Sequence, residues 1–250
     1  MNLLGTNPLR TIRERIGAAI GVFAISFVCC LVGVGMTFFL APRQAMQANR
    51  ISNLPVVSLA DVEAATTGDT VLITGVVNGT PPHPEIVNFV AYAGEKWVVT
   101  VPDPNELDST TSEPTGSWES FPTVLPDLFL EMEGQLVPIH AASTARLDGA
   151  LHELTVPGAS TLSAKDGVEP ITDGTIRYHG LDNGVLTTVL GVKASDEGVT
   201  PEQIFAGDRA AFEESQHQAA SGFLISGICM FILAPLVLFG GLTWVVFKRR

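Results

Sequence analysis

Two long uncharged runs constrain this 250-residue chain more than any other feature of its sequence. No charged residue occurs from Ile16 to Pro42, and none occurs from Ala219 to Phe247. A helix rises 1.5 Å per residue, so about 26 residues reach about 39 Å, whereas the hydrocarbon layer of a bilayer is about 30 Å thick. The sequence therefore predicts two transmembrane helices, residues 16–41 and 221–247. The first run exceeds the ~7–15 apolar residues of a signal peptide, so we expect an uncleaved anchor.

The basic residues near these runs predict their orientation. Six of them lie on the terminal sides, in the tail 1–15 and in the end segment 248–250, and three lie on the central side. Because basic residues concentrate in the cytoplasm, we expect both termini there and the central domain outside, as in a multi-pass protein of a bacterial-type plasma membrane. The residues counted are Arg10, Arg13, Arg15 and Lys248 to Arg250, against Arg43, Arg50 and Arg209.

The central segment, residues 42–220, is strongly acidic. It holds 8 Lys+Arg and 25 Asp+Glu, a net charge of −17. This charge argues against nucleic acid as a partner, because nucleic-acid binding needs a basic surface. All three cysteines, Cys29, Cys30 and Cys229, lie in the apolar runs. The central segment therefore has no disulfide, no Cys-based zinc site and no thiol nucleophile.

Short runs rich in Val, Ile, Leu and Thr, separated by Gly, Pro and Asp, predict β-strands in the central segment. We expect a polar tether over 42–55, a β-rich domain over 56–200 with an exposed acidic loop at 102–117, and a juxtamembrane helix over 201–220. The expected strands and turns are 71–77, a hairpin over 86–101 turning at Gly94, a hairpin over 129–140 turning at Gly134, 150–157, and 185–193 entered by the turn Asp182-Asn183-Gly184.

Two of these strands repeat one pattern. Gly68 to Val76 and Gly184 to Val192 each have a glycine, six residues and then Gly-Val. A glycine after an apolar run suits a bulge or bend where a sheet curls. The repeat predicts a small, partly closed barrel of OB-like type, and a chance match between two common residue types is the alternative. The predicted fold class is thus a membrane protein with two transmembrane helices flanking a mainly β extracytoplasmic domain.

The end of the domain carries helix-start signals. Thr200-Pro201-Glu202-Gln203 has the pattern of a capping box, and Asp208 offers a second N-cap after Gly207. From there no Gly or Pro occurs until Gly222. We expect a helix that starts in the domain and continues into the second apolar run.

The sequence offers little catalytic chemistry. It contains no GxxxxGK[ST], HExxH or GxSxG motif and no GxGxxG after a strand, so we predict no catalytic, metal or cofactor site. The five histidines have no ligand spacing, and the scattered acids indicate a solvated negative face instead of a calcium site. A Ser/Lys dyad needs no fixed spacing, but it needs a buried lysine. The candidates are Lys96, Lys165 and Lys193.

Two residue groups suggest contacts with partners. Four aromatic residues, Phe89, Trp97, Trp118 and Phe121, flank the acidic loop and could form a partner-facing groove, although large aromatics in a small β domain more often fill its core. Within the apolar runs, the small-residue pairs Gly17/Gly21 and Gly222/Ser226 predict close helix packing, and hence a homo-oligomer as one option. Beyond these, the bilayer is the partner that the sequence predicts most directly.

Four stretches resemble a known family. They are ATTGDTVLITGVV, VAYAGEKWVV, IRYHGLDNGVLTTVLGV and PEQIFAGDRAAFEESQ, and the similarity spans roughly residues 55–245. Their layout is similar to the GIDE domain of the mitochondrial-anchored ubiquitin ligase family and of its shorter bacterial relatives. The resemblance implies a membrane-embedded frame with a partner-binding β domain. It implies no ligase activity, because the cytosolic RING domain that supplies that activity has no counterpart before the sequence ends at Arg250.

These observations favour a non-catalytic binding or scaffold protein whose partner is another membrane or envelope protein. The alternatives are a hydrolase with a Ser/Lys or carboxylate site on the β domain, and an accessory subunit of a membrane protein-quality-control complex. An enzyme would bring titratable groups together in a pocket, whereas a binding module would expose an apolar patch or a free sheet edge.

Overall fold

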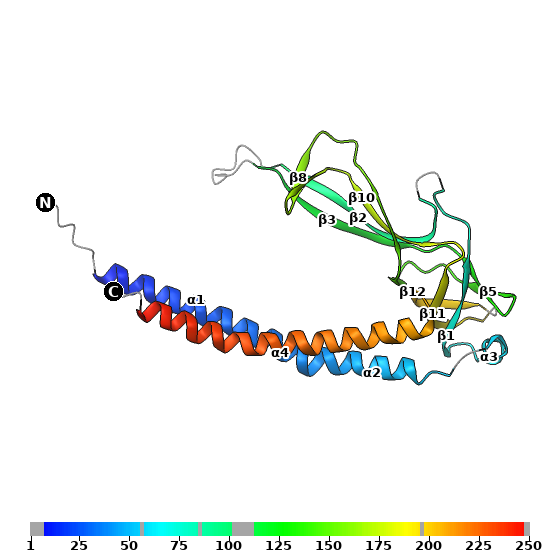
Figure 1. Ribbon diagram of the computed structural model, residues 1–250, viewed down its shortest axis with the longest axis horizontal. Coiled ribbons are helices and arrows are strands. Elements are labelled where there is room, and N and C mark those ends of the chain that lie inside the picture. The colour runs from blue at the N-terminus through cyan, green and yellow to red at the C-terminus, as the bar shows by residue number, and fades with distance from the viewer. Residues whose placement is uncertain (1–7, 56–57, 85–86, 102–112, 196–197, 248–250) are drawn as a thin grey trace. The chain divides into compact units, whose positions relative to one another are not determined.

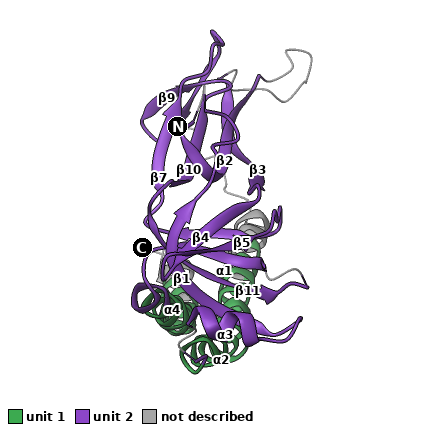
Figure 2. Cartoon of the chain, turned by 90° about the vertical axis from the view of Figure 1, so that its right-hand side faces the viewer, with its two compact units in different colours: residues 1–53, 213–250 green, residues 54–212 purple. Residues whose placement is uncertain are grey.

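The computed structural model (Figure 1) describes residues 8–55, 58–84, 87–101, 113–195 and 198–247. The chain forms two compact units, which are described separately below (Figure 2). Unit 1 combines Met1–Asn53 with Glu213–Arg250, and unit 2 is Leu54–Phe212.

Unit 1 is a pair of long helices. The first consists of α1 (Pro8–Gly35), the π turn η1 (Met36–Leu40) and α2 (Ala41–Ser52), and the second is α4 (Arg209–Phe247). The stretches Ile20–Ser52 and Arg209–Gly241 are long and apolar enough to cross a membrane, with mean hydropathies of 2.4 and 2.5. Only 11% of the most apolar window of each is buried. The prediction of two long apolar helices on either side of a β domain in the sequence is confirmed.

The first helix is longer than the sequence suggested. The expected tether over 42–55 is helical as far as Ser52, and Pro42 lies near the start of α2. A proline ring collides with the carbonyl four residues earlier in an α-helix, and it has no N–H to donate. The π turn lies in the residues just before Pro42, and the Ala41 N–H donates to the Met36 carbonyl. This wider turn admits the proline, so the helix continues.

The expected helix start at Thr200 is wrong. Residues Val199–Ala206 form strand β12, which pairs with three other strands. The local capping pattern therefore loses to sheet pairing, which also buries Ile204. The second start signal is confirmed, because the Asp208 carboxylate accepts from the Ala211 N–H at 2.8 Å and α4 begins at Arg209. The Arg209 guanidinium donates to the carbonyls of Leu54 and Pro55.

Five strands of unit 2 close into a barrel. They are β1 (Thr70–Asn78), β4 (Leu128–Met132), β5 (Gln135–Ile139), β12 and β11 (Leu186–Lys193), joined in that order, with β11 pairing back onto β1. All the pairings are antiparallel except β5 with β12, which is parallel and has Val199 opposite Ile139. Strand β6 (Arg146–Gly149) adds to β12. The predicted small barrel is confirmed, and it is closed.

The barrel interior is aliphatic. Its largest fully buried side chains include Ile73, Leu130 and Ile139. The short helix α3 (Leu59–Ala64) adds Val62 to this core. Side chains alternate in burial along β4. Leu128, Leu130 and Met132 point into the barrel, and the two residues between them are exposed on its outer wall.

The remaining strands form a second sheet at the other end of unit 2 (Figure 2). Its order is β3-β2-β10-β7, and a hairpin of β8 and β9 accompanies it. Strands β2 and β3 lie between β1 and β4 in the chain, and β7 to β10 lie between β5 and β11. The sheet is therefore built from two excursions out of the barrel. The strands are β2 (Phe89–Thr100), β3 (Thr115–Val124), β7 (His152–Val156), β8 (Ser163–Asp166), β9 (Glu169–Thr172) and β10 (Ile176–Asp182).

Most predicted strands and turns are confirmed, with one clear exception. The turns at Gly134 and Gly184 have positive φ values of 82° and 81°, as their sequences suggested. The repeated Gly-Val strands are β1 and β11, which pair with each other. The predicted turn at Gly94 is wrong, because β2 runs through it. Of the predicted acidic loop, residues 102–112 lie outside the described residues, and β3 already starts at Thr115.

Candidate functional site

The four aromatic residues predicted to face a partner all lie on the second sheet. Phe89 and Trp97 are buried, each 2% exposed, so they belong to the interior of unit 2. Trp118 and Phe121 are half-buried on the edge strand β3. The core-packing interpretation therefore holds for the first two, whereas the last two retain surface that a partner could contact.

One face of this sheet carries an aromatic triad. The rings of Tyr92, Phe121 and Tyr178 meet edge to face, with centroids 5.4–6.4 Å apart. Such geometry aligns the positive edge of one ring with the negative face of the next. Burial raises the pKa of Tyr92, and the neighbouring Tyr178 phenol adds to the shift.

The opposite face carries a tryptophan pair. Trp97 and Trp118 are cross-strand partners with centroids 5.1 Å apart. The Arg177 guanidinium carbon lies 4.2 Å from the Trp118 ring centroid, and the Trp118 Nε1–H donates to Asp166 at 2.9 Å. The half-buried tryptophan is thus held by a cation–π contact and a hydrogen bond, which leaves it little freedom to reorient toward a partner.

Three glycines make room for the aromatic rings of this sheet. A Cβ at Gly94 would collide with the ring of Phe121, and one at Gly180 would collide with the ring of Phe89. Gly116 and Trp97 form a third such pair. The glycine at position 94 is therefore explained by the close approach of the Phe121 ring within a strand, and not by a turn.

The barrel presents an exposed apolar surface that the sequence analysis missed. Val76, Phe129, Leu136 and Leu186 are 37–53% exposed on its outer wall. We call these four residues the barrel patch. Leu186 pairs with Val76, Val76 with Glu131, and Glu131 with Leu136, so the patch crosses four neighbouring strands. The only sequence signal was the outward position of Phe129 and Leu136 in the in–out alternation.

A groove borders the barrel patch within unit 2. Its volume is about 540 Å³, and it includes Val76 and Leu186 of the patch. Three carboxylates also line it, those of Glu131, Glu133 and Asp208, together with the side chain of Arg209, whose guanidinium donates to the Leu54 and Pro55 carbonyls. Acidic groups beside exposed apolar side chains favour a partner surface that is apolar with basic groups at its border.

The contact between α1 and α4 uses small residues other than the predicted ones. A Cβ built at Gly33 would lie 3.0 Å from the Gly227 carbonyl oxygen, and one at Gly241 would collide with Val22. These pairs show that the helices run antiparallel. By contrast, Gly17, Gly21 and Gly222 have open space at the Cβ position, and Ser226 is exposed. Close packing through those four residues stays a prediction for other helices.

No group of three His, Cys, Asp or Glu side chains in the described part of the chain could hold a metal ion. Among the lysines, Lys193 is buried, and its Nζ has no hydrogen-bond partner among the residues that the structure describes. Two histidines pair with carboxylates on neighbouring strands, His152 with Asp182 at 3.1 Å and His179 with Glu153 at 3.4 Å. These are exposed pairs of the kind common on protein surfaces.

Comparisons with protein-family models, with curated proteins and with solved structures found no match to this chain. The resemblance to the GIDE domain therefore stays a prediction from the four sequence stretches. What the chain does must be argued from its own surfaces.

Proposed function

We propose that this chain is a two-span membrane protein that displays a GIDE-like, OB-like β domain outside the cytoplasm as a non-catalytic binding module. The partner that we propose is another membrane or envelope protein. The barrel patch is the observation that carries this proposal.

The positions of the apolar side chains support membrane insertion. A helix that is apolar on all sides belongs either in the core of a large protein or in a bilayer. Here about nine-tenths of each apolar window is unburied, and the exposed residues include Phe27, Leu31 and Phe231. Lipid would cover this surface, whereas water would leave it exposed at a large cost in free energy.

The barrel order supports the OB-like assignment. Numbered by their order in the chain, the five barrel strands follow one another in space as 1-2-3-5-4-1. Strands 3 and 5, which are β5 and β12, form the parallel pair. The OB-fold is a five-stranded Greek-key barrel, and its ligands, such as oligonucleotides and oligosaccharides, bind to the face of strands 2 and 3 and to two loops.

The barrel patch suits protein binding because it joins exposed apolar side chains to an acidic border. Single exposed apolar residues are ordinary, but several on neighbouring strands of one wall favour an interaction surface. Phe129 and Leu136 supply the largest exposed side chains of the set. The carboxylates of Glu131 and Glu133 lie beside the patch. The net negative charge of the whole segment 42–220 would also disfavour binding of other proteins with an acidic surface.

Site-specific photocrosslinking in intact cells tests the proposal. A photoreactive amino acid at position 136 should form a discrete covalent adduct with one membrane or envelope protein, identified by mass spectrometry. The same residue at position 168, an exposed valine at the tip of the β8–β9 hairpin, is the matched control and should not form that adduct.

A charge substitution sharpens this test. Phe129→Glu should lower the adduct yield at position 136 about tenfold or more, since central apolar contacts dominate binding energy. Val168→Glu should leave the yield unchanged. An unchanged yield in the Phe129→Glu protein, with the chain still in the carbonate-resistant membrane fraction, would refute the barrel patch as the binding surface.

A further inference from the structure

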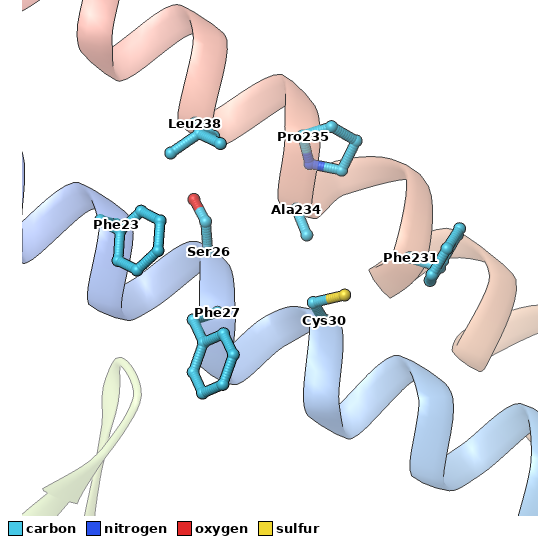
Figure 3. Close-up of a pocket in the computed structure, with 8 residues that line it drawn as sticks. All are labelled: Phe23, Ser26, Phe27, Cys30, Phe231, Ala234, Pro235 and Leu238. Atoms are coloured by element: carbon cyan, nitrogen blue, oxygen red, sulfur yellow. The ribbon is translucent and has the colours of Figure 1, made fainter.

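A cavity of about 320 Å³ lies between α1 and α4 of unit 1 and is open to the outside of the helix pair (Figure 3). Its lining residues recur at helical spacing on one face of each helix, so the cavity follows from how the two helices pack. Its size is at the lower end of the range for small-molecule sites. The lining residues are Phe23, Ser26, Phe27 and Cys30 of α1 and Phe231, Ala234, Pro235 and Leu238 of α4.

Close contacts on both sides hold this cavity open. On one side, a Cβ at Gly33 would lie 3.0 Å from both the Gly227 oxygen and the Phe231 nitrogen. On the other side, Gly241 meets Val22. Because the helices already touch at both places, they cannot approach further to fill the space between. The cavity is therefore a consequence of helix packing, and a ligand of suitable size can occupy it without separating the helices.

One buried polar group faces this apolar space. Ser26 is only 5% exposed, and its Oγ has no hydrogen-bond partner within the described part of the chain. Figure 3 shows the Ser26 hydroxyl pointing from α1 toward α4, near Leu238 and Ala234. The cavity thus offers one unpaired hydroxyl among apolar side chains.

We propose that this cavity binds an aliphatic molecule carrying a single hydroxyl group, a long-chain alcohol in chemical terms. The ligand hydroxyl accepts a hydrogen bond from Ser26 Oγ. The rings of Phe23, Phe27 and Phe231, which are 52–61% exposed, border its hydrocarbon part. A plain hydrocarbon would leave the buried serine hydroxyl unpaired, and an ionic group would find no opposite charge among the lining residues.

Photolabelling of the full-length protein in nanodiscs tests this inference. The probe is a twelve-carbon primary alcohol with a diazirine in its chain, and the matched control is the same diazirine alkane without the hydroxyl. After irradiation, mass spectrometry should place the alcohol label on residues 23–30 and 231–238. The alcohol should label these segments about tenfold more than the alkane, as expected for a hydrogen bond that pairs the buried Ser26 hydroxyl.

Three variants separate the hydroxyl contact from the apolar space. Ser26→Ala should reduce alcohol labelling to the alkane level, because it removes the polar partner and adds no bulk. Ala234→Leu should abolish labelling by both probes, because it fills the cavity. Ser226→Ala, at an exposed serine of α4, should change neither. Circular dichroism and size-exclusion chromatography establish that each variant keeps its helices.

Two results would overturn the inference. Equal labelling of the cavity by alcohol and alkane would mean that it holds lipid tails without selectivity. Crosslinks between two copies through residues 23–30, competing with the probe, would mean that a helix of a second copy occupies it. Neither result would alter crosslinking at position 136, so failure here is distinguishable from failure of the proposed binding function.

Discussion

The barrel and the second sheet of unit 2 obtain their stability in different ways. The barrel encloses an aliphatic core, in which side chains such as Ile73, Leu130 and Ile139 are fully buried, and its closure leaves no free edge among its five strands. The second sheet has a smaller core that consists mainly of aromatic rings. Its cohesion comes from rings such as Phe121 and Trp97, which lie over glycines of neighbouring strands.

Because of this difference, we expect the two parts of unit 2 to respond differently to substitutions. An aliphatic core accepts changes that conserve volume, because such side chains can repack. A ring that lies directly on a glycine Cα accepts no added atom at that glycine. We therefore expect the barrel to be sensitive to lost volume and the sheet to be sensitive to added volume.

The largest expected effect is in the barrel core. Leu130→Ala removes a side chain with no exposed surface and should lower the free energy of unfolding by about 2–5 kcal/mol. Phe129→Ala, at the adjacent outward position, should change it by no more than about 0.5 kcal/mol. Urea unfolding of the full-length protein in detergent, followed by tryptophan fluorescence, measures both. Equal losses in the two variants would contradict the in–out assignment of β4.

An intermediate effect is expected in the second sheet. Gly94→Ala should cost about 1–3 kcal/mol, because the new methyl group collides with the Phe121 ring. In a Phe121→Ala background the same substitution should cost much less. A double-mutant cycle of unfolding free energies measures this coupling, which we expect at about 0.5–3 kcal/mol. Additive costs would show that the ring does not explain the glycine.

The smallest effect concerns the pH dependence of α3, the helix that adds Val62 to the barrel core. The Asp61 carboxylate accepts from the Ser58 hydroxyl at 2.6 Å and from the Ser58 N–H at 2.9 Å, and these bonds hold the pKa of Asp61 below its ordinary 3.8. A carboxyl group whose pKa is lower in the folded protein than in the unfolded chain stabilises the fold at pH values above the unfolded-state pKa. This stabilisation is lost as the pH falls through the folded-state pKa.

Asp61→Asn removes that pH-dependent contribution. The wild type should therefore be more stable than the variant at about pH 6, and the difference should shrink toward about pH 2. Thermal unfolding midpoints of the two proteins across this range provide the measurement. A difference that grew on acidification would contradict the assigned hydrogen bonds.

Local signals explain which parts of the fold could be predicted from the sequence. The apolar strand 71–77 and the turn at Gly184 are correct because run length and turn chemistry decide them locally. The helix start at Thr200 is wrong because pairing of β12 with three strands outweighs a local cap. The turn at Gly94 is wrong because the reason for that glycine, Phe121, lies 27 positions further along the chain.

The candidate surfaces were less accessible to prediction. The alternation in FLEMEGQLVPI indicates which side chains point outward. It does not indicate that the rest of the described chain leaves Phe129 and Leu136 exposed. Similarly, several glycines in the apolar runs have spacing suited to helix contact. Only the rotation of α1 against α4 selects Gly33 and Gly227 over Gly17 and Gly21. Both outcomes depend on contacts between segments far apart in the sequence.

The double excursion from the barrel makes the second sheet a shared structure. Strand β10, from the later excursion, pairs with β2 from the earlier one along seven positions. Deleting either insertion would remove the strand that pairs with β2 or β10 of the other insertion. The chain could still be rejoined at the barrel, because Asn78 and Phe129 lie opposite each other and a tight loop could connect them. We therefore expect relatives that lack one insertion to lack both and to retain the barrel alone.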